Sequence, residues 1–431
     1  MTRGDTAAAR SRQITERRDP SVRAASHLRL VGGGRASEGR DPTTRSVERF
    51  DSIRTRSAIL LLVGVLCAIG LVMVLSASAY TSFEYYGSVW TIFERQVLWM
   101  GVGVIALFGS CRLPYERWRR LRVLLLFGSL VLLVAVLAPG VGVVSGGSSR
   151  WIGIGQLRIQ PSELVKLALV VFGADLIARR VDRAHETGAV TAPLVIVTLV
   201  AGVLLLGQPD MGTALVLACI CFALLFAGGV PLRTLARLLA GTASLALLLA
   251  LVEPYRRARL LSFLHPLQQR NGSGYQVVQS LVGLGNGHLY GLGLGNGRQK
   301  WGLLPNPHTD FIFSVIGEET GLIGTLVVLA LFVALAFYGL RAATRAPDRF
   351  ASLLAVGATA WITVQAVINI GAVIGVLPVT GIPLPFISFG GSSLVITMVA
   401  AGILANVAGY ERNPRIVSAH RVPSVPRRSR V

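Results

Sequence analysis

The stretch PNPHTDFIFSVIGEE, residues 305–319, runs from a rigid polar turn directly into an apolar segment. Asp310 stands where the two meet, so the sequence predicts a carboxylate at the mouth of a membrane helix. Glu318 and Glu319 follow inside the apolar run, where an unpaired charge is costly and ionisable groups usually serve a function. Glu318 lies about 12 Å deeper than Asp310 and about 80° round a helix, which favours a structural partner over a second catalytic carboxylate.

Apolar runs continue along most of the chain. Its 431 residues are 52% hydrophobic, with a mean hydropathy of +0.62. This composition excludes a soluble globular protein and predicts an all-α, polytopic integral membrane protein with about ten transmembrane helices. The expected spans are 58–79, 96–111, 123–144, 162–177, 189–206, 211–230, 235–252, 311–340, 352–376 and 387–409.

These spans divide the chain into three parts. Residues 1–56 are rich in Arg, Ser, Ala and Gly, and residues 411–431 in Arg, Pro and Ser. Neither segment can bury a core, so we expect a disordered basic cytoplasmic tail at each end. Residues 57–410 form the expected transmembrane domain, with a large extracytoplasmic loop, about 253–308, between the seventh and eighth helices.

The net charge of +21 is concentrated in the tails and in every second loop. This alternation follows the positive-inside rule, which predicts both termini in the cytoplasm. It accounts for the excess of arginine without nucleic acid as a partner.

Charged residues also lie where spans begin. Glu163 and Lys166 share a helix face and can pair, either to lock two helices together or to grip a polar ligand. Asp210, in the short turn QPDMGT at 208–213, either caps the next helix or faces the same polar cleft as Asp310. Asp310 itself either caps its helix or acts on a membrane-anchored substrate, since water and such a substrate can both reach it.

The expected loop before Asp310 is rich in glycine between 283 and 297. No strand–turn–helix unit surrounds these glycines, which argues against a dinucleotide fingerprint. They favour close approach of the backbone to a bulky ligand, or a moving loop. Arg298 and Lys300 follow them and either meet a phosphate or are solvated. The histidines show no metal-ligand spacing, so no dedicated metal site is predicted.

Proline and glycine crowd the segment 371–393 between the last two spans. Their density predicts a broken or re-entrant segment that lines a cavity or is shielded by protein. Ser392 at its end either satisfies freed backbone groups or contacts a ligand.

Four motifs in order carry a family resemblance: QPSELVK at 160–166, QPDMGT at 208–213, HTDFIFSVIGEE at 308–319 and LPFISFGGSS at 384–393. Together they resemble the SEDS family of shape, elongation, division and sporulation proteins, over roughly 58–409. The stretches QSL at 279–281 and GNGRQK at 295–300 resemble the division, FtsW-like branch more than the elongation, RodA-like branch.

The resemblance implies a peptidoglycan glycosyltransferase that polymerises lipid II, the undecaprenyl-pyrophosphate-linked disaccharide peptide. It implies action at the outer face of the bacterial cytoplasmic membrane, at the division septum. Asp310 matches the catalytic aspartate of the family, and Glu163, Lys166, Asp210 and Arg95 match positions in its cavity. A class B penicillin-binding transpeptidase and the division proteins are the implied partners.

The implied chemistry agrees with the residues. An α-linked pyrophosphate donor that forms a β-1,4 bond inverts at one carbon, which requires one general base. We expect Asp310 to take the acceptor proton, while Lys166, Arg298 or Lys300 stabilises the departing pyrophosphate. A divalent cation is a possible cofactor, although the sequence shows no dedicated cage.

Three alternatives remain at this stage. One is a flippase that transports lipid II; broken helices suit it, but the key acid at the outer face and the lack of an inverted repeat do not. Another is the elongation-type polymerase of the same family. The third is a scaffold that only recruits partners, for which buried charges would be costly without purpose.

Overall fold

The computed structural model describes residues 42–145, 148–154, 157–180, 187–253, 257–258, 262–269, 272 and 274–410. The chain divides into two compact units, Met1–Ser46 and Val47–Val431. Of the first unit the structure describes only the start of helix α1, and everything below concerns the second. Most of the predicted tails, residues 1–41 and 411–431, lies outside the described residues.

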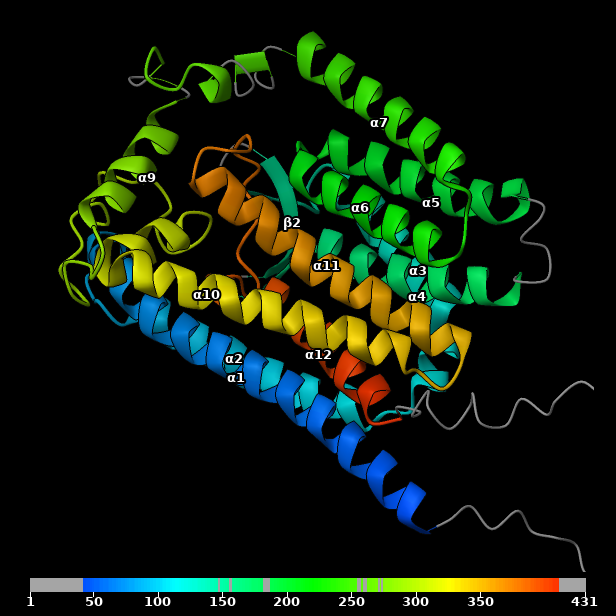
Figure 1. The fold of residues 1–431 in the computed structure, drawn as a ribbon. Coiled ribbons are helices and arrows are strands. Elements are labelled where there is room, and N and C mark those ends of the chain that lie inside the picture. Colours follow the sequence, from blue (N-terminus) through cyan, green and yellow to red (C-terminus); the bar gives the residue numbers. More distant parts are fainter. Residues whose placement is uncertain are drawn as a thin grey trace, which may run out of the picture. The chain divides into compact units, whose positions relative to one another are not determined.

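Each of the ten predicted spans coincides with a helix, as Figure 1 shows. These helices are α1 (Pro42–Tyr86), α2 (Thr91–Arg112), α3 (Tyr115–Leu137), α4 (Pro161–Arg179), α5 (Thr187–Gly207), α6 (Met211–Ala227), α7 (Leu232–Val252), α10 (Ile312–Thr344), α11 (Arg349–Val373) and α12 (Ser392–Ala408). Within the predicted large loop, α9 (Tyr275–Asn286) is a further short helix. The predicted all-α membrane fold is confirmed.

Some of these ten helices are better suited than others, by length and composition, to cross a membrane. In the described part of the chain, 6 helices are long and apolar enough to span a membrane: most of α1, α2, α3, most of α5, α10 and α11. Helices α6 and α12 are shorter but equally apolar. Helix α4 carries Glu163, Lys166, Asp175 and Arg179 along its length, which lowers its hydropathy although it is largely buried.

Several predicted boundaries differ from the structure: α1 ends later than expected, α2 and α3 begin earlier, and three further differences have a visible consequence or cause. Helix α1 begins at Pro42, inside the segment predicted to be a disordered tail. Helix α3 ends at Leu137, because Pro139 and the positive φ of Gly140 (84°) break the apolar run. Helix α12 begins only at Ser392, after Gly391 at φ 42°.

A small antiparallel sheet, which the all-α prediction lacked, follows the break after α3. It consists of β1 (Val143–Ser145), β2 (Ser148–Ile154) and β3 (Leu157–Ile159), in the order β1-β2-β3. Strand β2 contacts both α3 and α4. Arg150 on β2 donates to the carbonyls of Gln208 and Pro209, so the sheet is fastened to the turn between α5 and α6.

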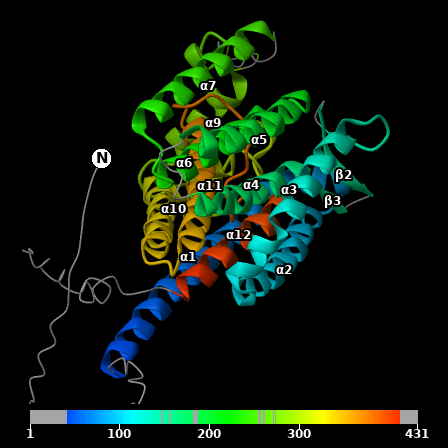
Figure 2. The same cartoon turned by 90° about the vertical axis from the view of Figure 1, so that its right-hand side faces the viewer.

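The helices pack around α4 and α11. Helix α4 contacts α3, α6 and α11, while α12 lies along α2, an arrangement that Figure 2 shows from the side. Helix α10 packs on α11, and its first turns also meet α1, where Ser76 donates to Glu319. Trp361 of α11 is fully buried at the centre of this apolar core.

Helix α10 is broken at Gly321, whose backbone (φ 69°, ψ −165°) is not helical. The break exposes backbone groups that pair with the glycine-rich segment: Leu292 N donates to Glu318 O at 3.0 Å, and Leu322 N donates to His288 O at 3.0 Å. A Cβ on Gly287 or Gly291 would overlap backbone atoms of α10. The predicted close approach therefore exists, but the approached group is the backbone of α10.

Candidate functional site

The α11–α12 connection, residues 374–391, is held by hydrogen bonds from two side chains of α11. Gln365 Nε2 donates to Pro383 O at 3.0 Å, and Asn369 Nδ2 donates to Ile382 O at 2.7 Å. The two residues lie four apart and so share a helix face. This pattern produces the broken segment that the sequence predicted and fixes its position against the helix.

Asp310 is joined to the same connection. Asn369 Nδ2 also donates to the backbone carbonyl of Asp310 at 2.8 Å, and Ser388 Oγ donates to Thr309 O at 2.6 Å. The N-cap position of α10 belongs to Phe311, so Asp310 precedes the helix rather than occupying its cap. A Cβ on Gly381 would lie 3.5 Å from Asp310 Oδ2, which places the carboxylate against the connection.

Asp310 lines a small, partly open pocket, with a cavity volume of about 10 Å³. Asn369, Thr380 and Gly381 line it as well. Within the described residues, Thr380 Oγ1 and Asn369 Oδ1 are buried without a hydrogen-bond partner. Buried polar atoms normally have a partner, so these two atoms mark the pocket beside Asp310 as a place for a polar guest.

Glu163 and Lys166 form a buried ion pair behind this pocket. Lys166 Nζ lies 2.8 Å from Glu163 Oε2 and donates to Gln365 Oε1 at 2.8 Å. The ammonium also lies 5.0 Å from the centre of the Trp361 ring. The side-chain amide of Gln365 also donates to Pro383 O. It therefore links the Glu163–Lys166 pair to the α11–α12 connection.

Asp210 is the N-cap of α6, as one of its two interpretations predicted. Its Oδ1 accepts from Thr213 N at 3.1 Å and its Oδ2 from Thr213 Oγ1 at 2.9 Å. Gln160 Nε2 approaches the same Oδ2 at 3.4 Å. The adjoining Gly212 lies so close to Ile382 that a Cβ there would overlap its side chain. The capped turn therefore borders the α11–α12 connection.

Ser392, at the other end of the α11–α12 connection, forms a hydrogen bond with the residue before α4. Its Oγ accepts from Gln160 N at 3.0 Å, immediately before α4 begins. The structure thus brings Asp310, Glu163, Lys166, Asp210 and Ser392 around one irregular segment.

Lys300 lies in a different cluster. Lys300 Nζ is 2.7 Å from Glu319 Oε1 and donates to Ser76 Oγ at 2.8 Å, and the lysine is only 4% exposed. Glu318 accepts from the backbone amides of Arg298 and Gln299 at 3.0 and 3.1 Å. The structural role predicted for Glu318 matches these contacts, since both acids hold the 295–300 segment on α10.

The other two predicted cations are exposed (Arg298) or partly exposed (Arg95). Arg298 is exposed, with its backbone fixed by Glu318. Arg95, in the first turn of α2, lies 4.6 Å from the centre of the Tyr86 ring and donates to its hydroxyl at 3.2 Å. In these contacts Arg95 joins α2 to the end of α1 rather than to the α11–α12 connection.

His308, two residues before Asp310, packs against Phe389 of the α11–α12 connection. Its ring lies 5.8 Å from that of Phe389, and its carbonyl accepts from Phe389 N at 2.9 Å. Burial lowers the pKa of the imidazole to about 4. The side chain is therefore neutral near pH 7. In the described part of the chain no group of three or more His, Cys, Asp or Glu residues is placed to hold a metal ion.

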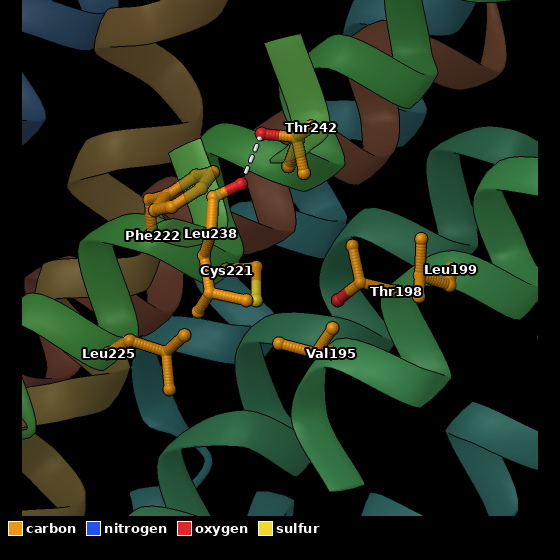
Figure 3. Close-up of a pocket in the computed structure, with 9 residues that line it drawn as sticks. Val195, Thr198, Leu199, Cys221, Phe222, Leu225, Leu238 and Thr242 are labelled. Atoms are coloured by element: carbon orange, nitrogen blue, oxygen red, sulfur yellow. Dashed lines mark hydrogen bonds between the residues drawn. The ribbon is translucent and has the colours of Figure 1, made fainter. Parts of the chain in front are cut away.

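A second pocket, with a cavity volume of about 40 Å³, lies between α5, α6 and α7 (Figure 3). Val195, Leu199, Phe222 and Leu225 provide an almost wholly apolar lining. Its hydroxyls are occupied by their own helices: Thr198 donates to Leu194 O and Thr242 to Leu238 O. This pocket therefore lacks the groups that acid–base chemistry needs.

Gln365, Asn369 and Thr380 were not among the predicted site residues. A signal was present, because Gln365 and Asn369 are polar residues at i and i+4 within an otherwise apolar span. Thr380 had no comparable signal, since its position depends on the path of the connection.

Comparison with known proteins adds independent information. The family model described as "Cell cycle protein", for the FtsW, RodA and SpoVE proteins, matches residues 56–413. Stage V sporulation protein E of Bacillus subtilis is 42% identical over 349 residues, covering 80% of this chain and 95% of that protein. The probable peptidoglycan glycosyltransferase FtsW of Mycobacterium tuberculosis is 43% identical over 364 residues, covering 84% and 69%.

Solved structures are similar over the same region. A chain of a peptidoglycan synthase complex, described as coordinating polymerization and crosslinking, superposes with a TM-score of 0.67 at 32% identity, covering 81% of this chain and 96% of that one. The rod shape determining protein RodA of Thermus thermophilus superposes with a TM-score of 0.61 at 30% identity, covering 81% and 95%.

Proposed function

The chain belongs to the FtsW, RodA and SpoVE family of cell cycle proteins, the SEDS family, and we propose on this basis that it is a peptidoglycan glycosyltransferase. It polymerises lipid II into glycan strands at the outer face of the cytoplasmic membrane during cell division. The observation that carries the proposal is the position of Asp310 at the mouth of α10, beside a pocket with unpartnered polar atoms.

Asp310 acts as the general base. The acceptor sugar hydroxyl attacks the anomeric carbon of the donor sugar while its proton passes to the Asp310 carboxylate. The bond from that carbon to the pyrophosphate oxygen breaks, and the electron pair leaves with the pyrophosphate. One base contributes roughly 10²- to 10⁴-fold in rate. Asn369 and Ser388 support the reaction by holding the backbone on either side of the base.

The predicted cations take different roles in this proposal. Arg298 is exposed. It is therefore the cation that meets the departing pyrophosphate. Lys166 is 1% exposed and occupied by Glu163 and Gln365, which suits a positioning residue for the α11–α12 connection. Lys300 positions the segment that carries Arg298, through its ion pair with Glu319.

Topology and partners follow from the same proposal. The alternating basic loops support a topology with the Asp310 end of the bundle outside and both termini in the cytoplasm. Relatives named FtsW and stage V sporulation protein E support a division-type over an elongation-type role, and hence the septum. A class B penicillin-binding transpeptidase is the proposed partner, supported by the similar chain from a peptidoglycan synthase complex.

Polymerisation of labelled lipid II by full-length protein in proteoliposomes tests the proposal, with and without the transpeptidase. We expect glycan chains from wild type and a loss of at least about 100-fold from Asp310→Asn. Asp348→Asn is the matched control, since Asp348 caps α11 and asparagine caps a helix as well as aspartate. Full activity of Asp310→Asn would remove it as the base, and movement of lipid II across the bilayer without chains would favour a flippase.

A further inference from the structure

A group of arginines surrounds one buried carboxylate at the far end of α4 from Glu163. Asp175 lies twelve residues beyond Glu163, about 18 Å along the helix axis. Arg119 and Arg122 come from the first turns of α3, and Arg179 is the last residue of α4. We call these four residues the Asp175 cluster; none of them has a place in the proposed glycosyl transfer.

All three guanidinium groups approach the carboxylate through Nε. Arg119 Nε lies 2.5 Å from Asp175 Oδ1, Arg122 Nε 2.7 Å from Oδ2, and Arg179 Nε 2.9 Å from Oδ1. This geometry leaves the terminal Nη nitrogens of Arg119 and Arg179 as further donors. Arginine presents such donors in a planar fork that matches the oxygens of a phosphate.

The charges within the cluster do not balance. Three cations face one anion, whereas Glu163 and Lys166 at the other end of α4 match one to one. Asp348, the N-cap of α11, does not supply a second anion in the ion pairs of the described residues: it accepts from Tyr115 Oη at 2.8 Å and caps its own helix through Ala351 N. A second anion beside the cluster would relieve the repulsion between the guanidinium groups.

The arginines are accessible although the carboxylate is not. Their side chains are 41%, 25% and 50% exposed for Arg119, Arg122 and Arg179, against 3% for Asp175. Arg119 also covers the Phe350 ring at 5.5 Å, which fixes its direction. The buried Asp175 carboxylate therefore holds three guanidinium groups in place at the surface.

An exposed apolar stripe follows the arginines on α3. Its members recur at helical spacing and face outward: Leu124 (68% exposed), Phe127 (68%), Val131 (48%) and Val134 (54%). Such a stripe on a membrane helix faces hydrocarbon. Because this stripe begins two residues beyond Arg122, the arginines lie where the hydrocarbon-facing part of α3 begins, which is the level of phospholipid headgroups.

We propose that the Asp175 cluster binds the phosphate of an anionic phospholipid headgroup at the membrane surface. Basic pockets between transmembrane helices bind such headgroups through the same chemistry. A zwitterionic headgroup binds less well, because its own ammonium approaches the arginines. Under the proposed topology this lipid belongs to the inner leaflet.

Native mass spectrometry of full-length protein in mixed micelles tests the site. The micelles contain equal amounts of dioleoylphosphatidylglycerol and dioleoylphosphatidylcholine, which differ only in headgroup. We expect wild type to retain the anionic lipid preferentially, and Arg119→Gln/Arg179→Gln to lose roughly tenfold of that preference. Arg122 remains in this variant to neutralise Asp175, so the fold is kept.

Arg233→Gln/Arg237→Gln is the matched control. It removes the same charge from exposed arginines at the start of α7, which have no shared carboxylate. A second variant, Arg119→Lys/Arg179→Lys, keeps the charge and loses the planar fork, and we expect an intermediate preference.

Three results would overturn the site. One is equal retention of both lipids by wild type, and another is an equal loss in the cluster and α7 variants, which would indicate a general charge effect. The third is displacement of the bound lipid by millimolar inorganic phosphate, which would assign the cluster to a free anion. Loss of the preference in the cluster variant alone, with an unchanged elution volume, supports the proposal.

Discussion

The buried pair of Glu163 and Lys166 gives the sharpest prediction for the stability of the fold. Their side chains are 2% and 1% exposed and meet at 2.8 Å. Lys166→Met removes the cation and leaves an uncompensated carboxylate inside the bundle. Breaking a buried pair from one side typically costs about 3–5 kcal/mol. Methionine fills a similar volume, so little of this cost comes from lost packing.

The double variant Glu163→Gln/Lys166→Met distinguishes lost charge balance from other effects. It leaves no uncompensated charge, and Gln365 Oε1 still accepts from Trp361 Nε1 at 2.9 Å. Replacing both partners of a buried pair is often close to neutral. We therefore expect the double variant to be more stable than Lys166→Met alone, with a coupling free energy of at least about 2 kcal/mol in a double-mutant cycle.

The assay is reversible unfolding by sodium dodecyl sulfate in mixed micelles, followed by tryptophan fluorescence. Arg233→Met, at an exposed position of α7, is the control for loss of a cation and should change the unfolding free energy by about 0.5 kcal/mol or less. Additive costs of the two single substitutions would refute the buried pair. Polymerisation should remain reduced in the double variant even where stability recovers, because Lys166 no longer orients Gln365.

Three further outcomes can be measured on the same protein. Gly321→Ala should destabilise the protein by about 1–3 kcal/mol, because the positive φ of 69° and the adjacent Gly291 N exclude a Cβ at this position. The control Gly101→Ala, within a regular helix, should be neutral or slightly stabilising. Equal thermal midpoints for the two variants would contradict this prediction. Asn369→Ala should lower the turnover of lipid II by tenfold or more with the fold retained, since one amide holds the carbonyls of Asp310 and Ile382; unchanged turnover would exclude the positioning role. His308 has a pKa of about 4 when folded, below its unfolded value of about 6.5. The unfolded chain therefore binds more protons between these values, and stability should fall as the pH drops from 6.5 to 4; His308→Gln should flatten that part of the pH dependence of the thermal midpoint.

Local patterns in the sequence were enough for much of the fold and part of the site. Apolar runs place the ten helices, because a membrane helix must satisfy its own backbone along its whole length. The pairing of Glu163 with Lys166 and the cap at Asp210 follow from spacings of three residues. The position of Asp310 just before α10 follows from the turn that precedes it.

Local sequence patterns could not predict contacts between distant segments. Lys300 pairs with Glu319 on the N-terminal side of the break in α10, which only Gly321 marks in the sequence. The arginines of 112–122 and 179–180 read as loop charges that orient the chain, yet Arg119, Arg122 and Arg179 converge on Asp175. Both arrangements depend on which helices are neighbours, and helical periodicity does not determine that.

The irregular α11–α12 connection explains why the site residues are spread so widely along the chain. Its carbonyls at Ile382 and Pro383 are bound by Asn369 and Gln365, which in turn bind Asp310 O and Lys166. A shift of α11 relative to α4 would therefore move the connection and the base together. The buried hydrogen bond from Lys166 of α4 to Gln365 of α11 opposes such a shift, because breaking it would leave buried polar groups without partners. Asp310 is thus held in register with its pocket by a hydrogen bond that lies outside the pocket, and the activity of the double variant, which lacks Lys166, measures how much that register contributes.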